Sequence, residues 1–359
     1  MKHLAGTVLL ALAVAAVADS IPDLTKQLNG TNQPSSTAIA GVESRDIPLP
    51  TGTSAGKQRT VSQRGIDYVQ ALRKNAPFGA TGFNLEGLRG GMGSRREPNI
   101  KGVRLVASKI GDIACEWVLA PGADPDLRLL YLHGGGFVSG SGAFYLTLAA
   151  RISAAAKCAV LLPDYRLAPE HPFPAGLDDC VRAHQWMIAT GPSGPGPAKV
   201  TFIAGDSAGG SLTLATLLAL RDRQLPLPAG GIPLSATTDL TLASESMQTV
   251  HDPILSARSM VVFRDLYLGK TDARSPLASP VFGDYRGLPP LLIQVGEHEI
   301  LRDDSIRVAK KARSDGTPVQ LEVWPGMFHV FQCHEPLLPE AEEAIEHIAG
   351  FIRARLPGQ

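Results

Sequence analysis

The sequence predicts an α/β protein with a mostly parallel central sheet flanked by helices, and three observations lead to this fold class. Short apolar runs bounded by Gly, Pro or polar residues recur from about residue 100 onwards, and such runs are typical of buried parallel strands. Helix-like segments lie between them, and alternation of strand and helix indicates a parallel sheet. The chain of 359 residues is long enough to bury one large core or two smaller ones.

The expected elements follow one another from residue 101. Two strands joined by a turn at Gly111-Asp112 come first, at 103–108 and 114–120. Five more strands are expected at 127–132, 158–163, 199–205, 289–296 and 319–324. Five helices are expected at 143–156, 176–189, 208–223, 305–316 and 339–356. Residues 238–285 contain no clear strand, so we expect a helical insertion between two strands of the sheet.

The N-terminal hundred residues follow a different pattern. Residues 1–18 combine a short basic start, an apolar run and an A-x-A sequence, which is typical of a signal peptide for export. The alternative is a helix that stays attached to a cytoplasmic protein. The run is shorter than the roughly 20 apolar residues of a membrane span. Residues 19–65 are expected to be irregular, a short helix is expected at 66–72, and residues 76–100 are again rich in Gly.

Charge and cysteine content restrict the classes of partner. The chain carries 34 basic and 34 acidic residues with no basic stripe, so nothing predicts binding to nucleic acid or to an anionic membrane. A small or uncharged partner is expected instead. The four cysteines lack the spacing of a zinc site and are expected to be buried free thiols, with a disulfide as the alternative in an exported chain.

A serine between two glycines lies where an expected strand ends and an expected helix begins. In IAGDSAGGSL, residues 203–212, Ser207 follows Gly205 and precedes Gly209. The G-x-S-x-G pattern places a serine on a sharp strand-to-helix turn, where its hydroxyl stands above the sheet as a nucleophile. The turn needs small neighbours, and Ala208 also meets that need. The alternative is a glycine-rich helix start capped by a serine.

Three successive glycines follow the expected strand 127–132. Gly134, Gly135 and Gly136 leave backbone N–H groups free to converge on one point, as in an oxyanion hole for the charge that develops during acyl transfer. The N–H of Ala208 is the expected third donor. The alternatives are a flexible glycine turn and a phosphate cradle, but the sequence lacks the glycine spacing of phosphate-binding motifs.

A serine nucleophile needs a general base, which is most often a histidine. In sheets of this type the order along the chain is Ser, acid, His. His329 is the preferred base because it follows an expected strand end and precedes the last helix. His334 is expected at the surface. The other histidines after the serine are His251, His298 and His347.

The base in turn needs a carboxylate that orients its ring. Four acidic residues follow the expected strand 289–296, within QVGEHEILRDDS. Glu299 is the preferred acid because it lies in the loop, within reach of the His329 ring. Asp303 or Asp304 is expected to cap the helix that follows.

Four motifs occur in order along the chain. They are HGGG at 133–136, DYRLAPEHPFPA at 164–175, GDSAGG at 205–210 and PGMFH at 325–329. Together they resemble the hormone-sensitive lipase family of α/β-hydrolases, the bacterial family IV esterases. The resemblance implies an α/β-hydrolase fold with a helical cap. It implies the following roles: Ser207 as nucleophile, His329 as base, Glu299 as acid, and an oxyanion hole of Gly135, Gly136 and Ala208 with Gly134 shaping its turn.

The resemblance also implies how the chain is divided. Residues 96–359 form the catalytic domain. The cap over the site is built from the N-terminal segment 19–95 and from the insertion 238–285. Dimers formed through edge strands occur in the family, so a homodimer is compatible with the resemblance.

The acid position and the charged residues of the second motif each have a physical consequence. Many family members carry Asp-Pro-Leu at the acid position, where this chain has Glu299-Ile300-Leu301. Glu is one methylene longer, so its loop must lie slightly further back. In the second motif, Asp164, Arg166 and Glu170 are expected to brace the site through polar contacts, because a buried charge without a partner is unfavourable.

The expected reaction is two-step ester hydrolysis through an acyl-enzyme, without a metal or cofactor, on a small ester with a short- to medium-chain acyl group. A lactone or an acetylated natural product would use the same atoms. The rival from another class is a non-catalytic ligand-binding protein, as in plant gibberellin receptors that have lost the catalytic His, but His329 is present here. An S-x-x-K pattern at 54–57 lies in a loop rich in Gly and Thr, which argues against that class of serine enzyme.

Overall fold

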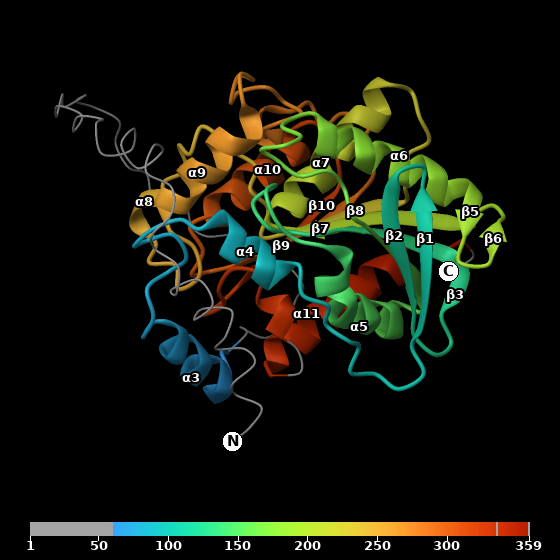
Figure 1. Ribbon diagram of the computed structural model, residues 1–359, viewed down its shortest axis with the longest axis horizontal. Helices are drawn as coiled ribbons and strands as arrows, with labels where there is room; N and C mark the ends of the chain where they lie inside the picture. The colour runs from blue at the N-terminus through green and yellow to red at the C-terminus, as the bar shows by residue number, and fades with distance from the viewer. Residues whose placement is uncertain (1–59, 335–336, 358–359) are drawn as a thin grey trace.

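A computed structural model describes residues 60–334 and 337–357 of the chain. Its centre is an eight-stranded sheet with strand order β1-β2-β4-β3-β7-β8-β9-β10 (Figure 1). The strands are β1 (Arg104–Ile110), β2 (Ile113–Leu119), β3 (Asp124–Leu132), β4 (Cys158–Pro163), β7 (Val200–Asp206), β8 (Gly230–Leu234), β9 (Leu291–Gly296) and β10 (Val319–Trp324). Strands β4, β3, β7, β8, β9 and β10 run parallel, and β2 is antiparallel to both β1 and β4. A small hairpin of β5 (Thr190–Gly191) and β6 (Gly194–Pro195) lies apart from this sheet.

Helices cover both faces of the sheet. They are α3 (Gln63–Leu72), α4 (Leu85–Met92), α5 (Leu146–Ala156), α6 (Ala175–Ala189), α7 (Ala208–Asp222), α8 (Ser246–Thr249), α9 (Ala257–Leu268), α10 (Arg302–Ser314) and α11 (Pro339–Arg353), with short 3₁₀ turns η1 (Gly142–Tyr145), η2 (Pro280–Phe282) and η3 (Phe331–His334). Helices α6, α7 and α10 lie on one face, and α5 and α11 lie on the other (Figure 1). Side chains of β3 alternate between the two cores, as the period of two in a strand requires: Leu130 and Leu132 face one, and Leu129 and Tyr131 face the other.

Strand β3 pairs with β4 on one side and with β7 on the other. The chain therefore adds strands to the sheet on one side of β3 first and on the other side afterwards. In open α/β sheets, ligands bind beyond the carboxyl ends of strands at such a point. The last pair in the β3–β7 register is Leu132 with Gly205. The glycine loop that follows Leu132 and the serine turn that follows Gly205 therefore begin side by side.

Strand β8 is absent from the sequence prediction, because GGIPL resembles a turn. All five of its residues are buried in the centre of the sheet. A Cβ at Gly230 would lie 2.7 Å from the Phe351 ring, and one at Gly231 would lie 2.6 Å from a methyl group of Leu217. The glycines are therefore needed for the helices on the two faces to pack closely. Helix α4 was also missed in its Gly-rich segment, where the Asn84 side chain accepts the N–H of Gly87 and caps the first turn.

The two segments expected to form a cap contact each other. Residues 60–95 contain α3 and α4, and residues 238–285 contain α8, α9 and η2. Phe78 and Leu255 form an isolated parallel β-bridge between them. The ring of Phe263 on α9 stacks on Phe78 at 5.9 Å between centroids. Figure 1 shows α3, α4 and α9 at the same end of the sheet.

Several expectations concern residues 1–59, which lie outside the described part of the chain. The signal peptide at 1–18 and the S-x-x-K pattern at 54–57 are among them, so export stays a prediction. In residues 60–334 and 337–357, no helix has the length and apolar character needed to cross a membrane. All four cysteines are free: three are buried, as expected, and Cys333 is partly exposed.

Candidate active site

Ser207 lies on a strained turn between β7 and α7. Its backbone has φ +54° and ψ −119°, a conformation that a residue with a side chain rarely adopts. A Cβ at Gly205 would lie 2.4 Å from the carbonyl oxygen of Gly209, and a Cβ at Gly209 would lie 2.0 Å from that of Leu132. Both flanking glycines are therefore required for the turn to form against β3.

The glycine loop after β3 presents two free N–H groups. Gly135 and Gly136 have φ of +120° and +64°, which glycine adopts without strain. The carbonyl of Gly135 accepts the N–H of Val138 and of Ser139, which closes the loop. Among the described residues, no group accepts a hydrogen bond from the N–H of Gly135 or Gly136. Both are available to an oxyanion.

Gly134 differs from the two glycines that follow it. Its N–H donates to the hydroxyl of Tyr145 at 3.1 Å. A Cβ at Gly134 would lie 2.3 Å from a carboxylate oxygen of Asp206. Gly134 therefore shapes the turn, and its N–H is not free to serve as an oxyanion donor. Ala208 is the first residue of α7, where the N–H groups have no partner within the helix.

Glu299 and His329 form a buried pair. The Nδ1 of His329 lies 3.0 Å from Oε2 of Glu299, a side chain with no exposed surface. The other oxygen, Oε1, accepts the hydroxyl of Ser235 at 2.8 Å and the N–H of Gly296 at 2.5 Å. The Ser235 hydroxyl also accepts the N–H of Val330 at 3.2 Å. The carboxylate is thus held from both sides, and the His329 ring is held by the carboxylate.

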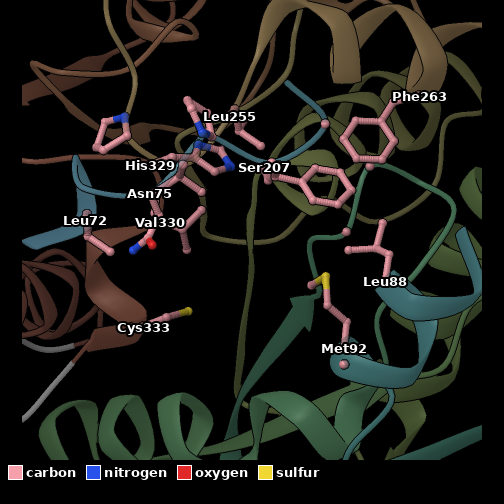
Figure 2. Close-up of a pocket in the computed structure, with 18 of the residues that line it drawn as sticks. Leu72, Asn75, Leu88, Met92, Ser207, Leu255, Phe263, His329, Val330 and Cys333 are labelled. Carbon is pink, nitrogen blue, oxygen red and sulfur yellow. The ribbon is translucent and has the colours of Figure 1, made fainter. Parts of the chain in front are cut away.

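Ser207 and His329 line one cavity of about 320 Å³ (Figure 2). Gly135, Gly136 and Asp206 line it as well, so the free N–H groups face the same space as the serine. Most of the remaining lining is apolar and comes from the two segments expected to form a cap. The cavity therefore brings together a serine hydroxyl, a histidine ring oriented by a carboxylate and two backbone N–H groups without a partner in the described chain.

Comparison with known proteins identifies the family of this chain. A family model for the alpha/beta hydrolase fold matches residues 129–333. An acetyl-hydrolase of Streptomyces hygroscopicus is 43% identical over 246 residues, which are 68% of this chain and 81% of the relative. An esterase of Acinetobacter venetianus is 36% identical over 226 residues, or 62% and 73% of the two chains. The crystal structure of an esterase from the bacterial hormone-sensitive lipase family superposes with a TM-score of 0.74 at 38% identity, over 83% of this chain and all of the other.

This chain belongs to the hormone-sensitive lipase family of α/β-hydrolases. It is a carboxylic ester hydrolase, as its relatives and structural neighbours are. The fold class and family expected from the four motifs are confirmed.

In this esterase the His329 ring lies among several carboxylates. Although burial of the ring disfavours the imidazolium ion, the hydrogen bond to Glu299 and the charges of Glu299, Asp252 and Asp206 raise the pKa of His329 above its ordinary value. A protonated His329 cannot accept the proton of Ser207. Activity is therefore lost as the pH falls through this raised pKa.

We expect the acidic limb of the kcat/KM profile to have its midpoint above pH 6.5, the ordinary pKa of histidine. The measurement is hydrolysis of a p-nitrophenyl ester from about pH 5 to pH 9, followed at the isosbestic wavelength of p-nitrophenol. Tryptophan fluorescence over the same range checks that the protein stays folded. A midpoint below 6.5 in folded protein would contradict the assigned electrostatics.

Asp252 is a buried carboxylate that sequence reasoning missed. One of its oxygens accepts the N–H groups of Ile254 and Leu255, at 2.8 and 3.1 Å. The other accepts the N–H of Ile300 at 3.1 Å, next to Glu299 in the chain. Burial raises the pKa of Asp252 to about 6. Asp252 therefore connects the cavity wall to the acid loop. In the sequence, only the neighbouring Pro253 indicates a turn at this position.

The expectation that Asp303 or Asp304 caps the helix after the acid loop was wrong. Helix α10 begins at Arg302, so Asp303 and Asp304 lie inside its first turn and do not cap it. Asp304 is fully buried and accepts the N–H groups of Thr238 and Asp239, both at 2.9 Å. Both carboxylates hold the start of the 238–285 insertion, because Asp303 also accepts the N–H of Ser246 at 2.8 Å.

His334 was expected at the surface, but the structure shows it half-buried. It lines the cavity, its Nδ1 lies 2.8 Å from the Tyr68 hydroxyl, and burial lowers its pKa to about 4. The other histidines lie elsewhere: His251 is exposed, His298 is partly buried, and His347 lies beside Glu322 with 2.7 Å between Nδ1 and Oε1. None of these three lines the cavity.

The bracing contacts expected in the second motif are present, with partners that sequence reasoning did not identify. Asp164 accepts the N–H of Gly142 at 2.7 Å. Arg166 pairs with the buried Asp179 at 2.8 Å. Glu170 pairs with Arg89 of α4 at 2.6 Å, although both side chains are partly exposed. Arg89 also donates to the carbonyl of Val138 at 2.7 Å, which connects α4 to the glycine loop.

Proposed function

We propose that the chain is a serine carboxylesterase that acts through an acyl-enzyme. The observation that supports this most strongly is the His329–Glu299 hydrogen bond of 3.0 Å on the wall of the cavity that holds Ser207. His329 takes the proton of Ser207 through Nε2 while Oγ attacks the ester carbonyl. The N–H groups of Gly135, Gly136 and Ala208 hold the developing oxyanion.

His329 then gives its proton to the departing alcohol, which leaves an acyl group on Ser207. A water molecule repeats the sequence: His329 takes its proton, the hydroxide adds to the acyl carbon, and the acid leaves as Ser207 regains its proton. Glu299 accepts a hydrogen bond from Nδ1 of His329 and so keeps that proton on the side of the ring away from the serine. A non-catalytic binding role would not need this oriented pair.

The position of His329 indicates which end of the cavity takes which half of the ester. The leaving alcohol must lie beside His329, which protonates it, and the acyl chain therefore extends in the opposite direction. Figure 2 shows Leu72 and Val330 at the His329 end of the cavity, and Leu88, Met92 and Phe263 at the other end (Figure 2). We propose that this second end is the acyl pocket.

The substrate is a small ester with a short- to medium-chain acyl group. The acyl pocket is lined by apolar side chains of α4 and α9. The Streptomyces relative is an acetyl-hydrolase, which supports a small acyl group. A lactone or an acetylated natural product would use the same atoms. Neither has a specific contact in the cavity that favours it over a simple ester.

Hydrolysis of p-nitrophenyl esters from acetate to palmitate tests this assignment. We expect kcat/KM to peak at short to medium chains, and Met92→Ala to raise the decanoate to butyrate ratio by about fourfold or more, because each buried methylene is worth about 0.8 kcal/mol. Leu72→Ala is the matched control. It removes the same kind of contact at the alcohol end and should leave the ratio unchanged. If Leu72→Ala raised the decanoate to butyrate ratio and Met92→Ala did not, the assignment of the two ends of the cavity would be reversed.

A further inference from the structure

One hydroxyl group lies between the serine turn and the glycine loop. The hydroxyl of Tyr145 accepts the N–H of Gly134 at 3.1 Å and donates to Oδ2 of Asp206 at 2.8 Å. Asp206 directly precedes Ser207, and Gly134 directly precedes Gly135. A single side chain therefore connects the nucleophile's backbone to the backbone that carries the oxyanion donors.

The direction of these two hydrogen bonds follows from chemistry. The N–H of Gly134 can only donate, so the Tyr145 oxygen accepts from it. The carboxylate of Asp206 can only accept, so the hydroxyl proton points at Asp206. Burial raises the pKa of Tyr145 well above its ordinary value, which keeps the hydroxyl neutral and able to fill both roles.

We propose that Tyr145 is a positioning residue for ester hydrolysis, which holds the N–H groups of Gly135 and Gly136 in place relative to Ser207. The proposal rests on the proposed function. The donors must meet the oxyanion at hydrogen-bond distance, and a small displacement weakens the contact only when charge is present on that oxygen. Loss of the hydroxyl should therefore lower kcat and leave KM nearly unchanged.

Tyr131 provides a matched control for this role. Its hydroxyl donates to the other oxygen of Asp206, Oδ1, at 2.9 Å. Its ring is as deeply buried as that of Tyr145, and the two ring centroids are 5.7 Å apart. Tyr131 makes no hydrogen bond to Gly134 in the described chain. Changing either tyrosine to Phe removes one oxygen and one bond to Asp206, but only Tyr145→Phe also releases the Gly134 N–H.

The experiment compares wild type, Tyr145→Phe and Tyr131→Phe on p-nitrophenyl butyrate, together with inhibition by a trifluoromethyl ketone. The ketone carbon accepts Oγ of Ser207, and its oxygen becomes an oxyanion in the loop. We expect Tyr145→Phe to lower kcat by about 10- to 100-fold and to weaken inhibition by a similar factor, since removal of a whole donor costs about 10²- to 10³-fold. KM in that variant, and all constants of Tyr131→Phe, should stay within about threefold of wild type.

Equal losses in the two variants would overturn the proposal, because they would assign the effect to Asp206 alone. Wild-type values of kcat and of ketone inhibition in Tyr145→Phe would overturn the proposal as well. If Tyr145→Phe does not fold, backbone NMR of the wild-type protein provides the test: the ketone should shift the amide signals of Gly135 and Gly136 and leave that of Gly134 nearly unchanged. A large shift at Gly134 would contradict the proposal. Failure of the proposed function is recognised separately, as full activity of Ser207→Ala.

Discussion

Replacement of Ser207 by alanine is expected to lower kcat for a p-nitrophenyl ester by about four to six orders of magnitude, on the scale found for serines of catalytic triads. The variant loses the hydroxyl that we propose as the acceptor of the acyl group, while the glycine loop and the cavity remain. Small residual hydrolysis by water is therefore expected. The rate is measured at saturating ester, with circular dichroism to check the fold.

Ser211→Ala is the control for this variant. Ser211 lies one turn further along α7, and its N–H donates to the carbonyl of Ser207 at 3.1 Å. Its hydroxyl does not line the cavity, so kcat should change by no more than a few-fold. A phosphonate ester should label wild type at one site and leave Ser207→Ala unlabelled. Retention of more than about a hundredth of the activity by Ser207→Ala would contradict the nucleophile assignment.

Glu299→Gln is expected to lower kcat by about 10³- to 10⁴-fold with little change in fold. Oε1 of Glu299 is held by the Gly296 N–H and the Ser235 hydroxyl, which both donate to it. The amide oxygen of the variant must take that position, so its NH₂ group faces Nδ1 of His329. Nδ1 then becomes the acceptor and the ring proton moves to Nε2, where it blocks general-base catalysis.

Asp303→Asn is the control that separates the two acidic candidates of this loop. Asp303 accepts the N–H of Ser246 and pairs with Arg302, away from His329. Its replacement should change kcat by less than about tenfold. The measurement is kcat of both variants on the same ester, with thermal unfolding as the check on stability. A larger loss of kcat in Asp303→Asn than in Glu299→Gln would contradict the assignment of Glu299 as the acid.

The elements that sequence reasoning predicted correctly are those with a strong local pattern. Strands such as β3, β4 and β9 contain mostly apolar runs, and α7 follows a helix-start motif. Strand β8 has no such pattern, because its two glycines are required by the close packing of helices on both faces of the sheet. Helix α4 was missed for a related reason, since its three glycines weaken the local helix signal.

Ser207 and the loop of Gly135 and Gly136 could be recognised from residue order, because a tight turn needs small residues wherever it occurs and its requirement is local. The contacts of the acid loop could not be recognised from residue order. Glu299 depends for its position on Ser235, which lies 64 residues away in the chain, and Gly134 loses its N–H to Tyr145, which follows 11 residues later in η1. Such pairings leave no recognisable spacing in the sequence, because they exist only when the loops that follow the strands have folded against one another. The free donors and the oriented carboxylate were therefore decided by the tertiary structure.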